Sequence, residues 1–157
     1  MFNILVGYPT EAEEQQIIKQ VTGTHKPNVQ KLLDGRTVQD LQDIVRRVPV
    51  GDHVVEYASS LVRATRPKEK DAPAFVKEMV GWGAGPRAGI FLITAAKARA
   101  ILQGRYHATT GDVQHCAFPV LRHRILTTFN AEAAGVKSDQ IIRMLLEHFK
   151  PKAELEV

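Results

Sequence analysis

The sequence predicts an all-α fold, a helical bundle preceded by one short N-terminal strand. Segments with apolar residues at helical spacing fill most of the 157 residues, and capping signals stand where these segments begin. Phe2–Val6 is the one clear strand pattern, and it ends at a turn, Gly7–Pro9. Because a lone strand cannot form a sheet, we expect Phe2–Val6 to be the last strand of a sheet whose other strands lie outside this chain.

The first half of the chain contains three predicted helices. The first begins after Thr10, because Thr10 and Glu13 have the spacing of a capping box. Residues 22–28, which include a glycine and a proline, form a loop. A weaker cap at Thr37 begins the second helix, and Asp52 caps the third.

A helix from Pro86 is the clearest prediction in the second half. Proline suits the first helical position, and residues 88–102 are rich in Ala, Ile and Leu. Residues 75–79 are ambiguous between helix and strand. Three residues end or kink the remaining helices: Gly104, Pro119 and Pro151. Thr109 and Ser138 cap the helices that follow.

Composition points to a soluble globular protein. Hydrophobic residues make up 44% of the chain and charged residues 24%, and the sequence contains neither a membrane-length apolar run nor a signal-peptide pattern. A single cysteine, Cys116, excludes an internal disulfide and suits a reducing compartment, so we expect the cytoplasm. The net charge of +4 is modest and its basic residues are scattered, which permits affinity for phosphate or nucleic acid without requiring it.

Arg87 raises the clearest chemical question. It lies in the first turn of the predicted Pro86 helix, where the helix dipole disfavours an exposed cation by roughly 0.3–1 kcal/mol. The open N–H groups of that turn favour an anion, and phosphate is the common one. The residues alone leave two interpretations open: Arg87 faces a phosphate, or it points into solvent or pairs with a carboxylate such as Glu78.

Five segments, in the same order along the chain, resemble the C-terminal part of MoxR-type AAA+ ATPases. They are GYPTEAEE (7–14), YASSLVRATR (57–66), GAGPRA (83–88), AAKARAILQGRYHATTGDV (95–113) and VLRHRI (120–125). The resemblance covers nearly the whole chain. It implies that residues 1–9 end the ATPase core, that residues 10–150 form an α-helical region including the lid, and that residues 151–157 are a tail.

The resemblance also implies roles for particular residues. Arg87 corresponds to the sensor-2 arginine, a catalytic residue that reaches the phosphates of ATP bound between core and lid. Gly85 and Pro86 complete the nucleotide-binding motif, and Gly85 stands where the family usually has serine. Tyr8 and Pro9 lie at the hinge between core and lid, where they either pack near the adenine or pack within the hinge itself.

The cofactor expected for the complete protein is ATP with Mg²⁺. The sequence has no GxxxxGK[ST] phosphate loop and no apolar strand ending in Asp-Glu, so we expect this chain alone neither to bind ATP tightly nor to hydrolyse it. We therefore expect it to be a fragment of a longer protein. Membership of the family implies three kinds of partner: the ATPase core of the same polypeptide, further copies in a ring that is expected to be a hexamer, and often a protein with a von Willebrand factor A-type domain.

The same resemblance implies coupling of the nucleotide state to chaperone-like remodelling of client proteins or to insertion of metal cofactors. The alternative is a stand-alone basic helical module that binds nucleic acid or a protein partner. Of these two partners, nucleic acid is less favoured than a protein. Salt-dependent binding of DNA in the absence of nucleotide would support the nucleic-acid alternative.

The remaining candidate residues carry weaker signals. Arg122-His123-Arg124 permits a phosphate or partner contact, but a solvated face or the capping of a helix C-terminus explains it equally well. Arg63 and Arg66 suit the dipole at a helix C-terminus. No metal site is predicted, because four candidate ligands lack a known zinc spacing and Cys116 is most simply buried. These candidates are His107, His115, Cys116 and His123.

Overall fold

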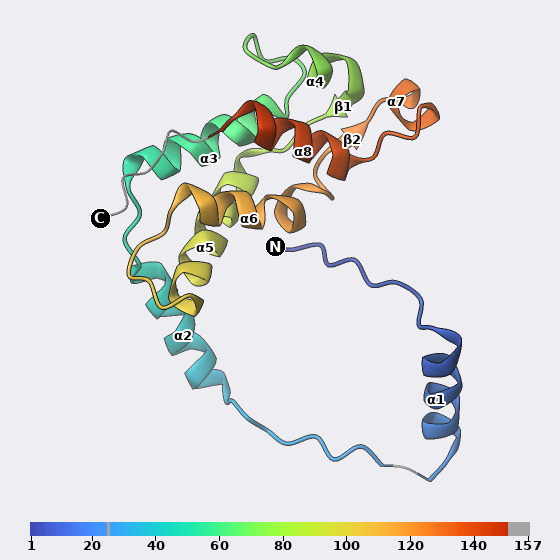
Figure 1. The fold of residues 1–157 in the computed structure, drawn as a ribbon. Coiled ribbons are helices and arrows are strands. Elements are labelled where there is room, and N and C mark those ends of the chain that lie inside the picture. The colour runs from blue at the N-terminus through green and yellow to red at the C-terminus, as the bar shows by residue number, and fades with distance from the viewer. Residues whose placement is uncertain (25, 151–157) are drawn as a thin grey trace.

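The computed structural model describes residues 1–24 and 26–150, and this part of the chain is mainly helical (Figure 1). Its helices are α1 (Glu11–Thr22), α2 (Gly35–Arg47), α3 (Asp52–Ala64), α4 (Ala74–Met79), α5 (Pro86–Leu102), α6 (Thr110–Leu121), α7 (Phe129–Ala133) and α8 (Ser138–His148). Two short strands, β1 (Val80–Trp82) and β2 (Leu126–Thr127), complete it. The prediction of an all-α fold is confirmed.

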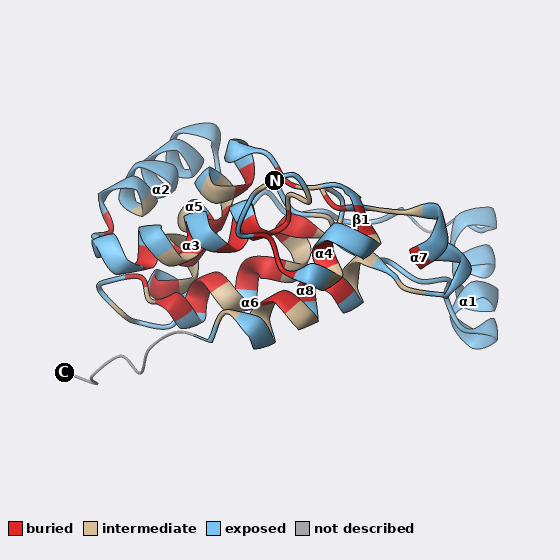
Figure 2. Ribbon diagram, turned by 90° about the horizontal axis from the view of Figure 1, so that it is seen from above, coloured by how far each residue is buried: buried red, intermediate tan, exposed pale blue. Residues whose placement is uncertain are grey.

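Helix α5 lies at the centre of the helical body. It packs against α6 and α3 most extensively, and α8 covers α6 (Figure 2). Burial of each large apolar side chain stabilises the fold by roughly 1.5–3 kcal/mol. The largest fully buried ones include Leu61, Leu92, Leu121, Ile141, Ile142 and Leu145. This core fixes the first turn of α5 between the end of α3 and the end of α6.

Two of the five predicted caps are confirmed, whereas Thr37, Asp52 and Ser138 lie inside the first turn of their helices, and Lys137 is the N-cap residue of α8. Thr10 and Thr109 each cap a helix within a capping box, as expected. The second helix begins earlier than predicted, because Asp34 caps it and accepts hydrogen bonds from the N–H of Thr37 at 2.8 Å and from its hydroxyl at 2.6 Å. Asp52 lies inside the first turn of α3, and Gly51 is the N-cap residue.

A kink or a stop is expected at Pro119, and the stop is wrong, because Pro119 does not end α6. The helix continues to Leu121, although a proline inside a helix costs about 3 kcal/mol or more. Val120 and Leu121 are both fully buried in the core, and their packing offsets this cost. Pro151 lies outside the described residues.

Residues 1–10 contain neither helix nor strand, so the strand expected at Phe2–Val6 is not formed. Strand geometry needs hydrogen bonds to a neighbouring strand, and none of the described residues offers one there. The segment instead contacts the helical body through the N–H of Asn3, which donates to the carbonyl of Pro119 at 2.7 Å. Helix α1 lies away from that body and buries none of its residues (Figure 1).

Strands β1 and β2 form an antiparallel pair that the sequence did not predict. Val80 pairs with Thr127 and Trp82 with Leu126, with an irregularity in between. The ambiguous residues before β1 form the short helix α4. Among residues 1–24 and 26–150, none of the helices is long and apolar enough to cross a membrane.

Asp112 is a buried charge that joins three segments. Its carboxylate is 0% exposed and accepts hydrogen bonds from Arg99 at 2.6 Å and from Arg105 at 2.5 and 2.8 Å. It also accepts from the N–H and the hydroxyl of Thr109, both at 3.0 Å. Burial alone would raise the pKa of Asp112, but the hydrogen bonds from Arg105, Thr109 and Arg99 outweigh it and hold that pKa well below its ordinary 3.8.

We predict that Asp112→Asn lowers the free energy of unfolding by about 2–3 kcal/mol, because it leaves two arginines without their counter-ion. This is less than the ~3–5 kcal/mol of a fully buried pair, since Arg99 and Arg105 are about a third exposed. Denaturant unfolding of the original chain and of Asp112→Asn measures this loss of stability. Exposed Asp40, with no hydrogen bond or ion pair in the described part of the chain, is the control, and Asp40→Asn should change stability by no more than about 0.5 kcal/mol.

The pH dependence of this effect has a definite sign. The pKa of Asp112 is lower in the folded state, so its contribution is full above the unfolded pKa and is lost as the pH falls through the folded pKa. The difference between the original chain and Asp112→Asn should therefore shrink as the pH is lowered below 3.8. A constant difference at acid pH would contradict the assignment.

Candidate functional site

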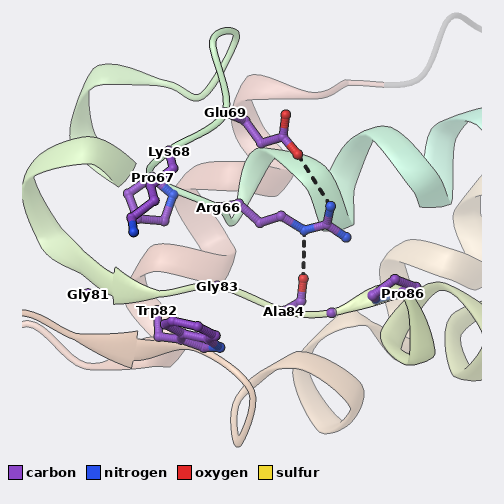
Figure 3. A pocket seen from close by; sticks show the side chains of 10 residues that line it. Arg66, Pro67, Lys68, Glu69, Gly81, Trp82, Gly83, Ala84 and Pro86 are labelled. Atoms are coloured by element: carbon purple, nitrogen blue, oxygen red, sulfur yellow. Dashed lines mark hydrogen bonds and ion pairs between the residues drawn. The ribbon is translucent and has the colours of Figure 1, made fainter.

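The segment that leads to Arg87 is fastened to the end of α3. Thr65, which is fully buried, accepts a hydrogen bond from the N–H of Ala84 at 2.8 Å and donates one to the carbonyl of Val62 at 2.6 Å. Arg66 donates from Nε to the carbonyl of Ala84 at 2.9 Å (Figure 3). Both backbone polar groups of Ala84 are therefore bound by the two residues that directly follow α3. We call these contacts the α3 clamp.

Arg66 is itself held in place by Glu69. Its guanidinium lies 3.3 Å from that carboxylate (Figure 3). The carboxylate also pairs with Arg63 at 2.8 Å. The sequence predicts only that Arg63 and Arg66 interact favourably with the dipole at a helix C-terminus. The positioning role of Arg66 was missed, because its partner Ala84 lies 18 residues further along the chain and no local pattern links the two.

Gly83 is the residue that allows the close approach of the two segments. A Cβ atom at this position would lie 2.2 Å from the carbonyl oxygen of Thr65 and 2.5 Å from its carbonyl carbon, so any side chain would displace the backbone. Gly85 is different, because a Cβ there would have no atom within 4 Å. It is the N-cap residue of α5, in an extended conformation that any residue can adopt, and it makes no side-chain capping bond.

Arg87 stands in the first turn of α5 with its side chain exposed. Pro86 occupies the first helical position, as predicted. Arg87 makes no hydrogen bond or ion pair with any residue that the structure describes, so the alternative pairing with Glu78 is not formed. Its cation is available to a ligand.

Two hollows flank the Gly83–Pro86 segment. The first, about 500 Å³, contains the Arg66–Glu69 ion pair, so its arginine already has a partner (Figure 3). The second, about 280 Å³, is lined by Arg87 together with Trp82, Gly83, Gly85, Ala88, His123, Arg124 and Leu126. No acidic residue lines this second hollow, which we call the arginine hollow. Its composition fits an anion.

The groups around the arginine hollow repel further positive charge. Burial lowers the pKa of Arg124, and the nearby Arg87 lowers it further. The pKa of His123 also lies below its ordinary 6.5, because of burial, Arg124 and the N-terminal ammonium group. His123 is therefore mostly neutral at pH 7, and it lies within hydrogen-bonding reach of Arg124.

The three residues of the Arg122-His123-Arg124 motif lie in two different environments. Arg122 forms a paired contact with Asp139 at 3.0 and 3.1 Å, which joins the end of α6 to α8. His123 and Arg124 instead line the arginine hollow. The proximity of Arg87 and Arg124 could not be found from the sequence, because the two residues lie on separate elements.

Tyr8 and Pro9 are not brought together with the Gly85–Arg87 segment. They line a different hollow beside α1, and Tyr8 is 100% exposed. Their expected place near a nucleotide stays a prediction. Among the four residues whose spacing fits no known zinc site, Cys116 is buried, which raises the pKa of its thiol. Residues 1–24 and 26–150 contain no group of three or more His, Cys, Asp or Glu that could hold a metal ion.

The two glycines beside Arg87 offer a matched test of the α3 clamp. We predict that Gly83→Ala lowers the free energy of unfolding by about 1–3 kcal/mol, the usual cost of forcing atoms into a filled space. Gly85→Ala should cost less than about 1 kcal/mol, because it meets no neighbour and loses only the N-cap preference for glycine. Denaturant unfolding of both variants measures the difference, and equal effects would show that the close approach at Gly83 does not constrain the loop.

Comparison with known proteins assigns the fold to a family. Residues 73–145 match the AAA lid domain. Chaperone MoxR1 from Mycobacterium tuberculosis is 34% identical over 147 residues, which span 94% of this chain and 39% of that protein. The uncharacterized protein YeaC from Bacillus subtilis is 26% identical over 151 residues, 96% of this chain and 44% of that protein.

A solved structure agrees with these relatives. The crystal structure of a protein from Cytophaga hutchinsonii, assigned as an ATPase, superposes with a TM-score of 0.78 at 29% identity, over 94% of this chain and 45% of that one. The part of the helical body from α4 to most of α8 is thus an AAA lid domain. The chain corresponds to the C-terminal lid part of a MoxR-type AAA+ ATPase, which confirms the resemblance found in the sequence. It spans less than half the length of the relatives it matches.

Proposed function

We propose that Arg87 is the sensor-2 arginine of this lid and that it binds the phosphates of ATP held between the lid and an ATPase core. The observation that carries the proposal is the arginine hollow. There an exposed arginine without a carboxylate partner stands at the N-terminus of α5, beside a second arginine and with no acidic residue in the lining.

The chemistry of this arrangement is electrostatic. Arg87 and the positive end of the α5 dipole act on the same anion, and a guanidinium binds phosphate oxygens through two parallel hydrogen bonds. Both groups stabilise negative charge that develops during phosphoryl transfer. The lining of the hollow fits phosphate oxygens, but it offers no carboxylate for Mg²⁺. ATP and Mg²⁺ would therefore be held chiefly by the core.

The α3 clamp explains how the nucleotide could move the lid. Because Ala84 is bound to α3 and α5 packs against both α3 and α6, a pull on Arg87 acts on the whole helical body. Loss of the terminal phosphate would release that pull. This is the proposed link between nucleotide state and chaperone-like remodelling of client proteins.

The rest of the proposed assembly follows from the family. The ATPase core of the same polypeptide would supply the phosphate loop, and further copies would complete a ring. Residues 1–9 would form the end of that core, with Tyr8 and Pro9 at the hinge. A protein with a von Willebrand factor A-type domain is a proposed partner, and the cytoplasm is the proposed location.

We predict that Arg87→Ala in the complete ATPase lowers ATP turnover by about tenfold or more, on the order of 1.4 kcal/mol in the barrier, and leaves the fold intact. Steady-state turnover and circular dichroism measure the two effects. The matched control is Arg143→Ala on α8, because Arg143 is exposed and forms no hydrogen bond or ion pair in the described part of the chain. Unchanged turnover in Arg87→Ala would remove this residue from the mechanism.

A further inference from the structure

Arg124 shares the arginine hollow with Arg87 but comes from a different part of the chain, between α6 and β2. Its guanidinium lies 5.2 Å from the centre of the Phe91 ring, and it donates a hydrogen bond to the carbonyl of Val120 at 2.5 Å. Phe91 follows Arg87 by four residues on α5, so the two side chains lie on the same face of the helix, one turn apart. The ring therefore holds Arg124 against the face of α5 that carries Arg87.

The charges of this region are not balanced within the described residues. Elsewhere in the helical body, buried or half-buried arginines have a carboxylate partner: Arg66 with Glu69, Arg99 and Arg105 with Asp112, and Arg122 with Asp139. Arg124 is also partly buried, yet its hydrogen bonds go to His123 and to the carbonyls of Val120 and Met1. Two like charges at the N-terminus of a helix repel each other, and an anion between them removes that repulsion.

The contact with Phe91 leaves part of the guanidinium for a ligand. A cation stacked on an aromatic ring loses much of its rotational freedom before any ligand binds. Arginine carries five N–H donors in a planar fork, and a carbonyl of the chain can occupy only some of them. Arg124 is thus oriented in advance beside Arg87.

We propose that Arg124 is a second phosphate-binding residue, which together with Arg87 holds the terminal phosphates of ATP from two separate elements of the lid. The inference rests on the proposed function of Arg87 and extends it to the Arg122-His123-Arg124 motif. Binding through both arginines ties α5 and the segment between α6 and β2 to one ligand.

The chain contains a built-in reporter for this proposal. Trp82 is the single tryptophan of the sequence, and it lines the same hollow. Tripolyphosphate, which carries the phosphate chain without the base, is the probe. The 157-residue chain is titrated with it at low ionic strength while the fluorescence of Trp82 is followed.

Four variants accompany the original chain: Arg87→Gln, Arg124→Gln, Arg124→Lys and the control Arg143→Gln. Each of the first two should weaken binding by at least about tenfold, since each removes a charge-assisted hydrogen bond. Arg124→Lys, which keeps the charge without the planar fork, should lie in between. Arg143→Gln should match the original chain, and ATP should compete with tripolyphosphate.

Each other result counts against a specific part of the proposal. If Arg87→Gln weakens binding and Arg124→Gln does not, the role of Arg124 is overturned and the proposed function stands. If Arg124→Gln weakens binding and Arg87→Gln does not, the role of Arg87 is contradicted. An original chain that shows no response to tripolyphosphate overturns both, and a response that ATP does not reverse overturns the link to the nucleotide.

A measurement without substitution guards against loss of folding in Arg124→Gln. In the NMR spectrum of the original chain, the Nε–H signal of Arg124 should shift as tripolyphosphate is added, while that of Arg143 should stay unchanged. A purely structural Arg124, packed on Phe91, would show no shift.

Discussion

The close contact between the end of α3 and the backbone of Ala84 is the constraint on which the site depends. Thr65 and Arg66 bind the N–H and the carbonyl of a single residue, and Gly83 passes within a distance of Thr65 that leaves no room for a side chain. Pro86, two residues after Ala84, is the first residue of α5. The direction of Arg87 is therefore set by α3, although no atom of α3 needs to touch the ligand.

Charged groups form two centres, one at each end of α5. Arg99 and Arg105 both donate to the carboxylate of Asp112, so each has a carboxylate partner and together they join the end of α5 to the start of α6. At the other end of α5, Arg87 and Arg124 have no carboxylate among the described residues that would do the same. Each centre contains two arginines, and the two centres differ in whether these arginines have a carboxylate partner.

Much of the fold could be predicted because its signals are local. Capping boxes at Thr10 and Thr109, and the proline at the start of α5, each act within one helical turn. The β1–β2 pair and the passage of α6 through Pro119 depend on contacts between distant segments, which periodicity does not report. The same limit applies to the site. Arg87 could be singled out from its helix position, whereas Arg66 and Arg124 gain their roles only when α3, α5 and the end of α6 come together.

The pairing of β1 with β2 links the backbone on both sides of the arginine hollow. Trp82 precedes Arg87 by five residues, its strand partner Leu126 follows Arg124 by two, and both line the hollow. Side chains alternate between the two faces of a strand, so a shift of one residue turns each of them to the opposite side. An insertion or deletion between Arg124 and Leu126 would therefore misalign the hollow even if every side chain in it were retained. The connection between α5 and α6 lies at the opposite end of α5, beyond Leu102, so a change in its length would disturb the ion pair between Arg105 and Asp112 and leave the arginine hollow aligned.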